Sequence, residues 1–163
     1  MSSIAEPEHG RGSQLIDQMA VRDVQIRYAL ALDDRRFDEL GSVFTADAVA
    51  EYRGMATHHG LGRIERACRR SLVHLDGTQH VITNFWCDVS GDSAAAGCYF
   101  TAHHVRGPVR FTAGGHYRDT LVRTEVGWRI SHRVAAVVWT DGDPAVLEPG
   151  SDRGAEIEGC HGG

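Results

Sequence analysis

The side chains best suited to move protons in this chain are its histidines, of which there are ten among 163 residues. Histidine changes its charge most readily near neutral pH, so it can serve as an acid or as a base. Many histidines alone prove no activity, but they direct the search for a site toward proton transfer. Five lie in apolar, strand-like surroundings: His80, His103, His104, His116 and His132.

One aspartate is placed where helix electrostatics disfavour it. Asp33 ends a long predicted helix, and the negative end of a helix macrodipole disfavours a carboxylate. Residues that break a local rule are expected at functional sites, so Asp33 is a candidate site residue. The alternative is a solvated carboxylate paired with Arg35 or Arg36.

The first half of the sequence has helical periodicity. Residues 14–33 contain no glycine or proline, and their apolar side chains recur at helical spacing, which predicts one long amphipathic helix. Ser13 is the predicted N-cap. The elements predicted next are a short helix over 37–44, a turn and short strand over 45–52, a loop at His58-His59-Gly60 and a helix over 62–74.

The second half has the periodicity of strands. Short turn sequences such as Ser90-Gly91-Asp92 separate four strand-like stretches and predict antiparallel neighbours. Gly114-Gly115 is a candidate bulge in the third stretch. The order of elements indicates an α+β fold, a cone-shaped barrel with three helices packed on a curved, mostly antiparallel sheet that encloses a pocket. The four stretches are 79–89, 93–105, 109–124 and 128–140.

Composition narrows the class of protein. The net charge of −5 argues against a nucleic-acid partner or a basic membrane-binding role. No apolar run approaches the roughly 20 residues of a membrane span, and no signal-peptide layout is present, so a cytoplasmic location is expected. The predicted organisation is a disordered leader over 1–13, one domain over 14–140 and a flexible tail over 141–163.

Motifs for several kinds of chemistry are missing from the sequence. No G-x-S-x-G elbow, Walker A sequence or G-x-G-x-x-G fingerprint occurs, so no cofactor is expected. A metal site from His80, His104 and His116 is conceivable on neighbouring strands, but no H-x-H or H-E-x-x-H spacing supports it, and no metal is predicted. The cysteines form no C-x-x-C pair. Buried free thiols are predicted at Cys68, Cys87 and Cys98.

Three segments carry a family pattern. The first reads IRYALALDDRRFDELGSVFTADAVAEY, a helix ending in aspartate followed by Phe-Asp-x-Leu and Phe-Thr-x-Asp-Ala. The second, GTQHVITNFWCDVSGDSAAAGCYFTAHHV, has a Thr-x-His strand and a Gly-Asp turn, and the third, GGHYRDTLVRTEVGWRISHRV, is a closing hairpin. Over about residues 14–140 the chain resembles SnoaL-like domains of the nuclear-transport-factor-two-like superfamily, in the branch of scytalone dehydratase and bile acid dehydratase.

The resemblance implies roles for individual residues. In the resembling dehydratases, an aspartate at the place of Asp33 partners a histidine, and the histidine at the place of His80 is the acid–base group. A carboxylate that orients an imidazole raises its basicity, so such a pair can transfer protons. Tyr52 matches a pocket tyrosine of that branch, and Tyr28 is a second candidate, since a phenol can hold a substrate carbonyl. A structural role in the core is the alternative for each.

Strand alternation adds three substrate-binding candidates. It places Asn84 on the face of His80, which the resemblance turns toward the pocket. Only one of two adjacent histidines can face the pocket, and the parity of the strand favours His104 over His103. The same choice, between His116 and Tyr117, stays open one strand later, with His116 as the candidate.

These residues and the resemblance together predict a cofactor-independent lyase or isomerase. The predicted reaction is proton abstraction next to a carbonyl of a hydrophobic cyclic substrate of polyketide-, steroid- or aromatic-like character, with dehydration preferred. The alternatives are a polyketide cyclase, a ketosteroid-type isomerase, an epoxide hydrolase, or a non-catalytic subunit that binds small molecules or serves in assembly. A homodimer or higher homo-oligomer is expected through the convex face of the sheet, with Phe85, Tyr99 and Trp139 as contact candidates.

Overall fold

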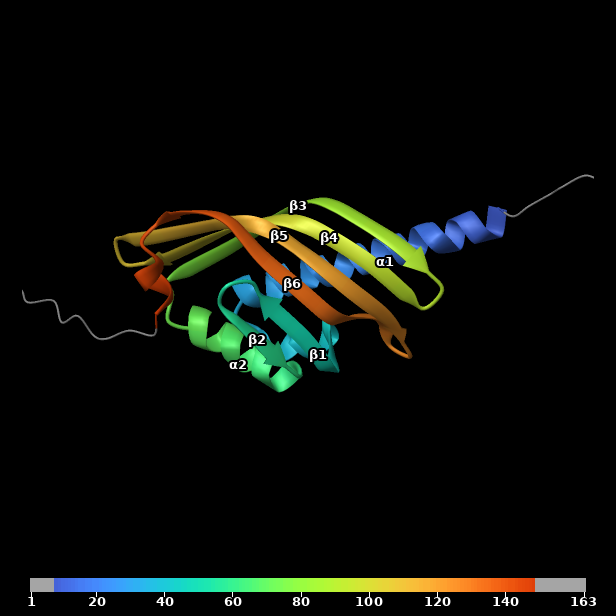
Figure 1. Ribbon diagram of the computed structural model, residues 1–163, viewed down its shortest axis with the longest axis horizontal. Coiled ribbons are helices and arrows are strands. Elements are labelled where there is room, and N and C mark those ends of the chain that lie inside the picture. Colours follow the sequence, from blue (N-terminus) through green and yellow to red (C-terminus); the bar gives the residue numbers. More distant parts are fainter. Residues whose placement is uncertain (1–7, 149–163) are drawn as a thin grey trace, which may run out of the picture.

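The computed structural model describes residues 8–148, and its longest helix is α1, Glu8–Asp33 (Figure 1). The helix begins upstream of its predicted start, so part of the predicted leader is helical and the rest lies outside the described residues. Ser13 lies inside the helix, and the prediction that it is the N-cap was wrong. Gly10 and Gly12 do not end the helix, because a glycine costs only about 1 kcal/mol relative to alanine there.

Short elements connect α1 to the long strands. The 3-10 helix η1 (Phe37–Ser42) and the strand β1 (Phe44–Tyr52) correspond to the predicted short helix and strand. The residues predicted as a loop instead form strand β2 (Ala56–His59), which pairs antiparallel with β1. These residues have no apolar alternation, so only backbone pairing across the turn at Gly54 makes them a strand. Helix α2 (Leu61–Leu72) follows.

Four long strands follow α2 and match the four predicted stretches. They pair antiparallel in chain order, as their short connections predict. Strand β1 joins the far side of β6 in the parallel direction and completes a six-stranded sheet of order β2-β1-β6-β5-β4-β3. The fold is the predicted α+β arrangement of helices on a curved, mostly antiparallel sheet. The long strands are β3 (Gly77–Ser90), β4 (Ser93–Arg106), β5 (Val109–Thr124) and β6 (Gly127–Gly142).

Bulges in the sheet decide which side chains face inward. The β5–β6 register shifts between Gly114 and Gly115, so the predicted bulge is confirmed. An unpredicted shift lies in β3 just before Trp86, where Asn84 has a positive φ of 53°. Asparagine is one of the few residues that tolerates this left-handed conformation. Beyond the bulge the alternation of β3 is inverted, so Phe85 faces inward and Trp86 is exposed.

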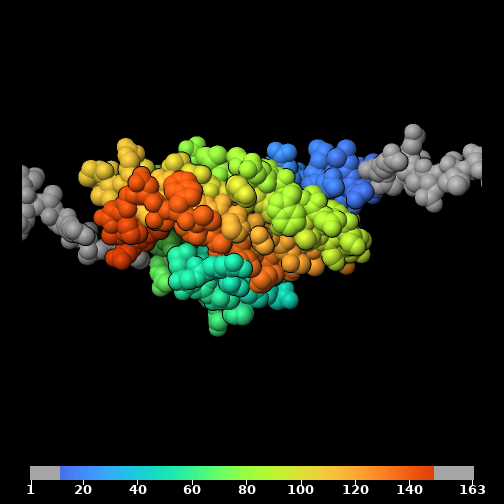
Figure 2. Space-filling view, turned by 45° about the horizontal axis from the view of Figure 1, so that its top comes forward, coloured from blue at the N-terminus to red at the C-terminus, as the bar shows by residue number. Residues whose placement is uncertain are grey.

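Helix α1 covers the concave face of the sheet and packs mainly on β3 (Figure 1). Its buried side, with Val21, Val24 and Tyr28, belongs to the main hydrophobic core. The guanidinium of Arg22 lies 4.6 Å from the ring centre of Phe85 on the strand below. Strands β1 and β2 form a separate flank of the molecule together with α2, which is seen in teal to green in Figure 2.

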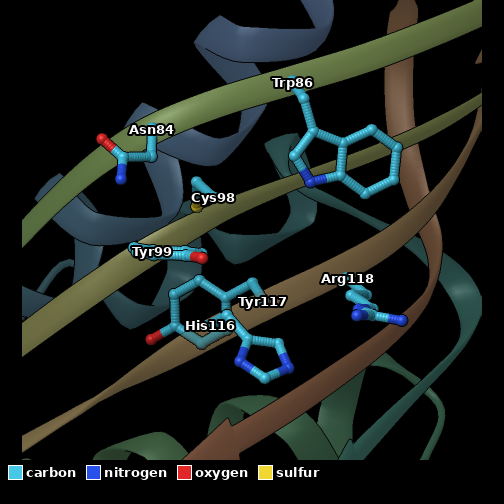
Figure 3. Close-up of a pocket in the computed structure, with 7 residues that line it drawn as sticks. All are labelled: Asn84, Trp86, Cys98, Tyr99, His116, Tyr117 and Arg118. Carbon is cyan, nitrogen blue, oxygen red and sulfur yellow. The ribbon is translucent and has the colours of Figure 1, made fainter.

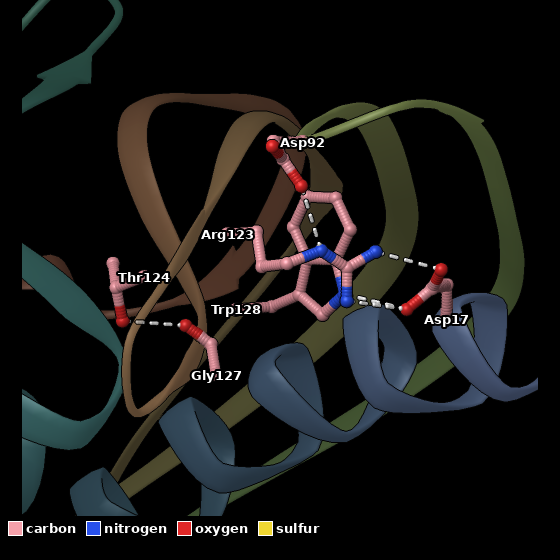
Figure 4. Close-up of polar contacts among 6 residues, drawn as sticks. All are labelled: Asp17, Asp92, Arg123, Thr124, Gly127 and Trp128. Carbon is pink, nitrogen blue, oxygen red and sulfur yellow. Dashed lines mark hydrogen bonds and ion pairs between the residues drawn. The ribbon is translucent and has the colours of Figure 1, made fainter.

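Arg123 ties the first half of α1 to the tips of the strands (Figure 4). Its guanidinium donates to both oxygens of Asp17, at 2.8 and 2.7 Å, and to Asp92 in the β3–β4 turn at 2.9 Å. It also lies 4.5 Å from the ring centre of Trp128. The hydrogen bond to Arg123 is the main reason why the pKa of Asp17 is lowered. These contacts help to fix how α1 crosses the sheet, and therefore where Asp33 lies at its other end.

The segment predicted as a flexible tail begins with ordered structure. Strand β6 runs to Gly142, and the 3-10 helix η2 (Pro144–Leu147) places the buried side chain of Val146 against β4 and β5. The rest of that segment, from residue 149, lies outside the described residues. Among the helices within residues 8–148, none has the length and apolar character needed to cross a membrane.

Candidate active site

Asp33 and His80 form a tight pair where the end of α1 meets the start of β3. The Nδ1 of His80 lies 2.6 Å from Oδ1 of Asp33, and the backbone N–H of His80 donates to the other carboxylate oxygen at 2.7 Å. The backbone contact fixes the carboxylate, and the ring contact in turn orients the imidazole. Its Nε2 is then the ring nitrogen that can meet a substrate. The side chain of His80 is 6% exposed and that of Asp33 is 20% exposed, so the pair is sheltered but not sealed from solvent.

His104 faces the same side of the sheet as this pair, as strand parity predicted. Its ring centre lies 5.9 Å from that of His80, with the rings perpendicular. Burial, together with the neighbouring His80, lowers the pKa of His104 to about 4, so its imidazole is neutral at neutral pH. His103 points outward and contacts Thr112 at 3.1 Å.

Two tyrosines meet farther inside the cone. The hydroxyl oxygens of Tyr28 and Tyr52 are 3.2 Å apart, and the sulfur of Cys68 lies 3.9 Å from the hydroxyl oxygen of Tyr52. Tyr28 also packs edge to face on Phe44 and Tyr117. Burial is the main reason why the pKa of each of these phenols lies well above its usual value. They are therefore neutral and able to donate a hydrogen bond.

The interior also holds a buried cation that the sequence reasoning missed. Arg133 is fully buried and donates two 2.7 Å hydrogen bonds to Asp119, which also accepts from Gln25 at 3.0 Å. Its guanidinium lies between the rings of Tyr28 and Tyr117, 4.1 and 4.3 Å from their centres. Burial alone would lower the pKa of Arg133, but the paired carboxylate outweighs it and raises that pKa. The sequence carried no clear signal for this pair, because both residues lie in strands that contain several other charged and polar side chains.

The chain matches the family model of the SnoaL-like domain over residues 13–134, which is most of its length. It belongs to the SnoaL-like domain family. An uncharacterised protein of Mycobacterium tuberculosis is 33% identical to this SnoaL-like domain over 127 residues, which cover 75% of this chain and 86% of the relative. The resemblance seen in the sequence is thereby confirmed.

Solved structures show how widely the fold is shared. A protein described as a proposed aromatic ring hydroxylase from Novosphingobium aromaticivorans has a TM-score of 0.76 at 26% identity, over 82% of this chain and 98% of that chain. A proposed scytalone dehydratase from the same organism has a TM-score of 0.76 at 20% identity, over 88% of this chain and 99% of that chain. The hexachlorocyclohexane dehydrochlorinase LinA-type3 of Novosphingobium barchaimii has a TM-score of 0.71 at 18% identity, over 80% of this chain and 92% of that chain.

Two predicted substrate-binding residues of this SnoaL-like domain lie on the wrong face of the sheet. Asn84 and His116 line a hollow of about 330 Å³ on the outer face, together with Trp86, Tyr99 and Arg118 (Figure 3). The bulge at Asn84 turns its side chain away from the face of His80. The prediction that these two side chains face the interior on the side of His80 was therefore wrong.

The regular β4–β5 ladder explains the position of His116. It pairs Cys98 directly with Tyr117, so the inward face that holds His104 and Cys98 continues to Tyr117. The neighbouring His116 is left on the outer face, where its ring lies beside that of Tyr99. Of the two choices that strand parity left open, the structure selects Tyr117.

Neither of the two hollows described within residues 8–148 is lined by Asp33, His80, Tyr28 or Tyr52, so neither is the pocket expected around them. A second hollow, of about 480 Å³, lies over the ends of β3, β4 and β5, and both inner-face residues (Thr78, His104) and outer-face residues (His103, Thr112) line it. On the concave face, Tyr28, Phe44 and Tyr117 pack against one another. Of the two members of the pair, Asp33 has the more exposed side chain.

Within residues 8–148, no three His, Cys, Asp or Glu side chains come together as a set that could hold a metal ion. A three-histidine site cannot form, because His116 points away from His80 and His104. Cys68 and Cys98 are buried free thiols as predicted, and Cys87 is partly buried.

Proposed function

We propose that this SnoaL-like domain is a cofactor-independent lyase that removes a proton next to a carbonyl group and then expels a leaving group, with loss of water preferred. The observation that supports it is the Asp33–His80 pair. Both carboxylate oxygens hold one histidine at the edge of an apolar interior. A fixed carboxylate that orients an imidazole is an arrangement suited to general base catalysis.

The proposed reaction assigns each group a task. The Nε2 of His80 takes the proton from the carbon beside the carbonyl, and Asp33 stabilises the imidazolium that forms. The carbonyl oxygen gains negative charge, and neutral Tyr28 or Tyr52 donates a hydrogen bond to it. Arg133 lies beside Tyr28 and adds positive potential to that part of the interior. The substrate enters from the side of Asp33, and the tightly packed aromatic side chains move apart to receive it.

The substrate class follows from the lining of the interior. Side chains such as Phe44, Phe100 and Tyr117 favour a hydrophobic ring system, and the polar groups among them favour one that bears a carbonyl. Two of the structural neighbours are a proposed dehydratase and a dehydrochlorinase, and both names describe eliminations. The same pair would also serve an isomerase or a cyclase, and the identity of the product decides among these outcomes.

The proposal is tested by replacing each member of the pair. Wild type, His80→Ala and Asp33→Asn are assayed for enone formation from a panel of polycyclic β-hydroxy ketones. We expect both variants to lose at least about 10² in rate, the usual contribution of a general acid or base. His103→Ala, on the next strand but facing outward, is the matched control and should keep the wild-type rate. Equal rates for wild type and both site variants, all folded, would refute the assignment.

A second candidate function is a non-catalytic binding or assembly subunit. It is favoured by one observation, the close packing of Tyr28, Phe44 and Tyr117 where an open pocket was expected. Absence of turnover on every compound of the panel would support this function over the first.

A further inference from the structure

The side of helix α2 that faces solvent is a row of arginines. The helix packs on β1, β2 and η1 and buries a row of side chains that begins at Ile64. Arg63, Arg66 and Arg70 are all exposed. With 3.6 residues in each turn, these three lie within about 60° of one another, opposite the buried row. They are called the arginine row below.

Nothing in the described part of the chain neutralises the arginine row. Its members form no ion pair with any residue of 8–148. Arg36, by contrast, contacts both Asp34 and Glu39. Arg69, the fourth arginine of α2, has its guanidinium 5.0 Å from the ring centre of Phe37. The arginine row therefore turns three unpaired cations toward solvent.

The arginine row is unfavourable for the helix that carries it. Its members are three and four residues apart, where like charges on a helix repel each other. Arg63 lies in the first turn, where the macrodipole favours a carboxylate, and that turn contains no acidic residue. Gly60, the N-cap, makes no side-chain hydrogen bond that could compensate. A helix that breaks several local rules on one side is expected where that side has a function.

The positive charge is concentrated on one flank of an acidic protein. The net charge of the chain is −5, yet α2 contains four arginines and a single acid, Glu65. Glu65 is half-buried and lies toward the packed side of the helix. Burial lowers the pKa of His58 in β2, and the charge of Arg70 adds to this effect. The flank of β1, β2 and α2 in Figure 2 thus differs in charge from the chain as a whole.

The chemistry of the arginine row selects the kind of partner. All 17 basic side chains of the chain are arginines, whose planar fork pairs with both oxygens of a carboxylate. The arginine row is about 10 Å long, too long for one carboxylate or phosphate to reach all three members. An acidic helix carries carboxylates at the same spacing. Helix α2 has no aromatic side chain on which a nucleic-acid base could stack.

We infer that the arginine row docks an acidic helix of a partner protein, which places carboxylates three or four residues apart opposite Arg63, Arg66 and Arg70. The three ion pairs are exposed, so the contact is weak, reversible and sensitive to salt. This docking does not depend on the proposed function, because the arginine row shares no residue with the Asp33–His80 pair.

Two synthetic helical peptides of identical composition test the docking. The first has its glutamates in one row along the helix, and the second has the same glutamates spread around it. Each carries a fluorophore, and its anisotropy is followed as the full-length protein is added, at about 0.05 M and about 0.3 M sodium chloride. The row variant is Arg63→Gln with Arg66→Gln and Arg70→Gln. The matched control removes three exposed arginines from other faces, as Arg27→Gln with Arg110→Gln and Arg118→Gln.

We expect the row variant to bind the first peptide about tenfold more weakly than wild type, the combined value of three exposed ion pairs. The matched control should bind it as wild type does. The second peptide should bind wild type more weakly than the first, and the higher salt concentration should weaken the binding of both. Glutamine is a good helix former, so the variants should stay folded, which circular dichroism checks.

A reversal of charge gives a gain that loss of folding cannot imitate. Glutamate at all three positions of the arginine row should abolish binding of the first peptide. The same variant should bind a peptide in which arginines replace the glutamates of the first.

Four results would overturn the docking. They are no saturable binding of the first peptide to wild type, equal binding of the two peptides, equal losses in the row variant and the matched control, and tighter binding of phosphatidylserine vesicles or single-stranded RNA to the arginine row. None of these assays uses a substrate, so their outcome is separate from that of the proposed function.

Discussion

The two faces of the long strands carry different side chains for different purposes. The inner face buries ionisable groups: Arg133 and Asp119 are fully buried as a pair, and His104 lies near His80. The outer face instead exposes large aromatic side chains, among them Tyr99, which is 58% exposed. Charges are thus hidden on one face of the sheet while apolar rings are shown on the other.

The outer aromatic side chains lie flat on glycines. The indole of Trp86 covers Gly97 and that of Trp139 covers Gly114, and a Cβ at either glycine would collide with the ring. A flat apolar surface suits contact with another surface, whereas the polar groups of the inner face suit chemistry. Strand alternation thus separates two tasks, and substitutions at matched positions on the two faces test that separation.

The largest contrast is expected between two arginines of neighbouring strands. Arg133→Met leaves Asp119 buried without its partner and should destabilise the fold by about 3–5 kcal/mol. Arg118→Met, on the outer face, should change stability by no more than about 0.5 kcal/mol. Urea unfolding of both variants measures the difference.

A double substitution sharpens this result. Replacing both charges, as Arg133→Met with Asp119→Leu, should recover part of the loss, because an apolar pair avoids the unpaired charge. Equal costs for the two single arginine variants would contradict the distinction between the faces.

Much of the fold could be predicted because its signals are local. Helical spacing before Asp33 and turn residues such as Ser90-Gly91-Asp92 are set by neighbours in the sequence, and they located α1 and the four long strands. The pairing of Asp33 with His80 followed from the family resemblance, and the geometry brings those two residues together. The inward position of His104 followed from simple alternation.

The failures share one physical cause, which is that bulges interrupt alternation without a strong local signal. The bulge at Asn84 reverses the parity of β3. Another register shift in β6, between the positions paired with Thr120 and Leu121, allows both Ile130 and Arg133 to face inward. Simple alternation would place these two on opposite faces, so Arg133 was missed. Register depends on the partner strand, which a single stretch of sequence does not contain.

The next contrast is in the response to pH. His104 has its pKa lowered from 6.5 to about 4 by burial, so the unfolded chain binds a proton more readily than the folded one between these values. Stability should therefore be full above pH 6.5 and fall as the pH drops toward 4, by up to about 3 kcal/mol from this residue.

Denaturant midpoints measured from pH 7 to pH 4.5 test this dependence. His104→Gln removes the titrating group and should flatten the curve, whereas His103→Gln, the exposed neighbour on the outer face, should leave the wild-type slope. A wild-type slope in the His104 variant would show that other groups carry the pH dependence.

The last effect on stability is small and is expected on the outer face, where we propose that a second copy of the chain docks. Trp86, Tyr99 and Trp139 are exposed there, whereas Phe85, an expected contact residue, is turned inward by the bulge and excluded. Trp139→Glu should cost the isolated fold about 1 kcal/mol or less, because its side chain is already half exposed. It should nevertheless convert a dimer to a monomer, since a charge opposes apolar contact.

Light scattering measures the mass, and Val126→Glu, exposed at the β5–β6 turn away from this face, is the control. A wild-type monomer would leave the flat aromatic surface without this partner, and a Trp139→Glu dimer would place the contact elsewhere.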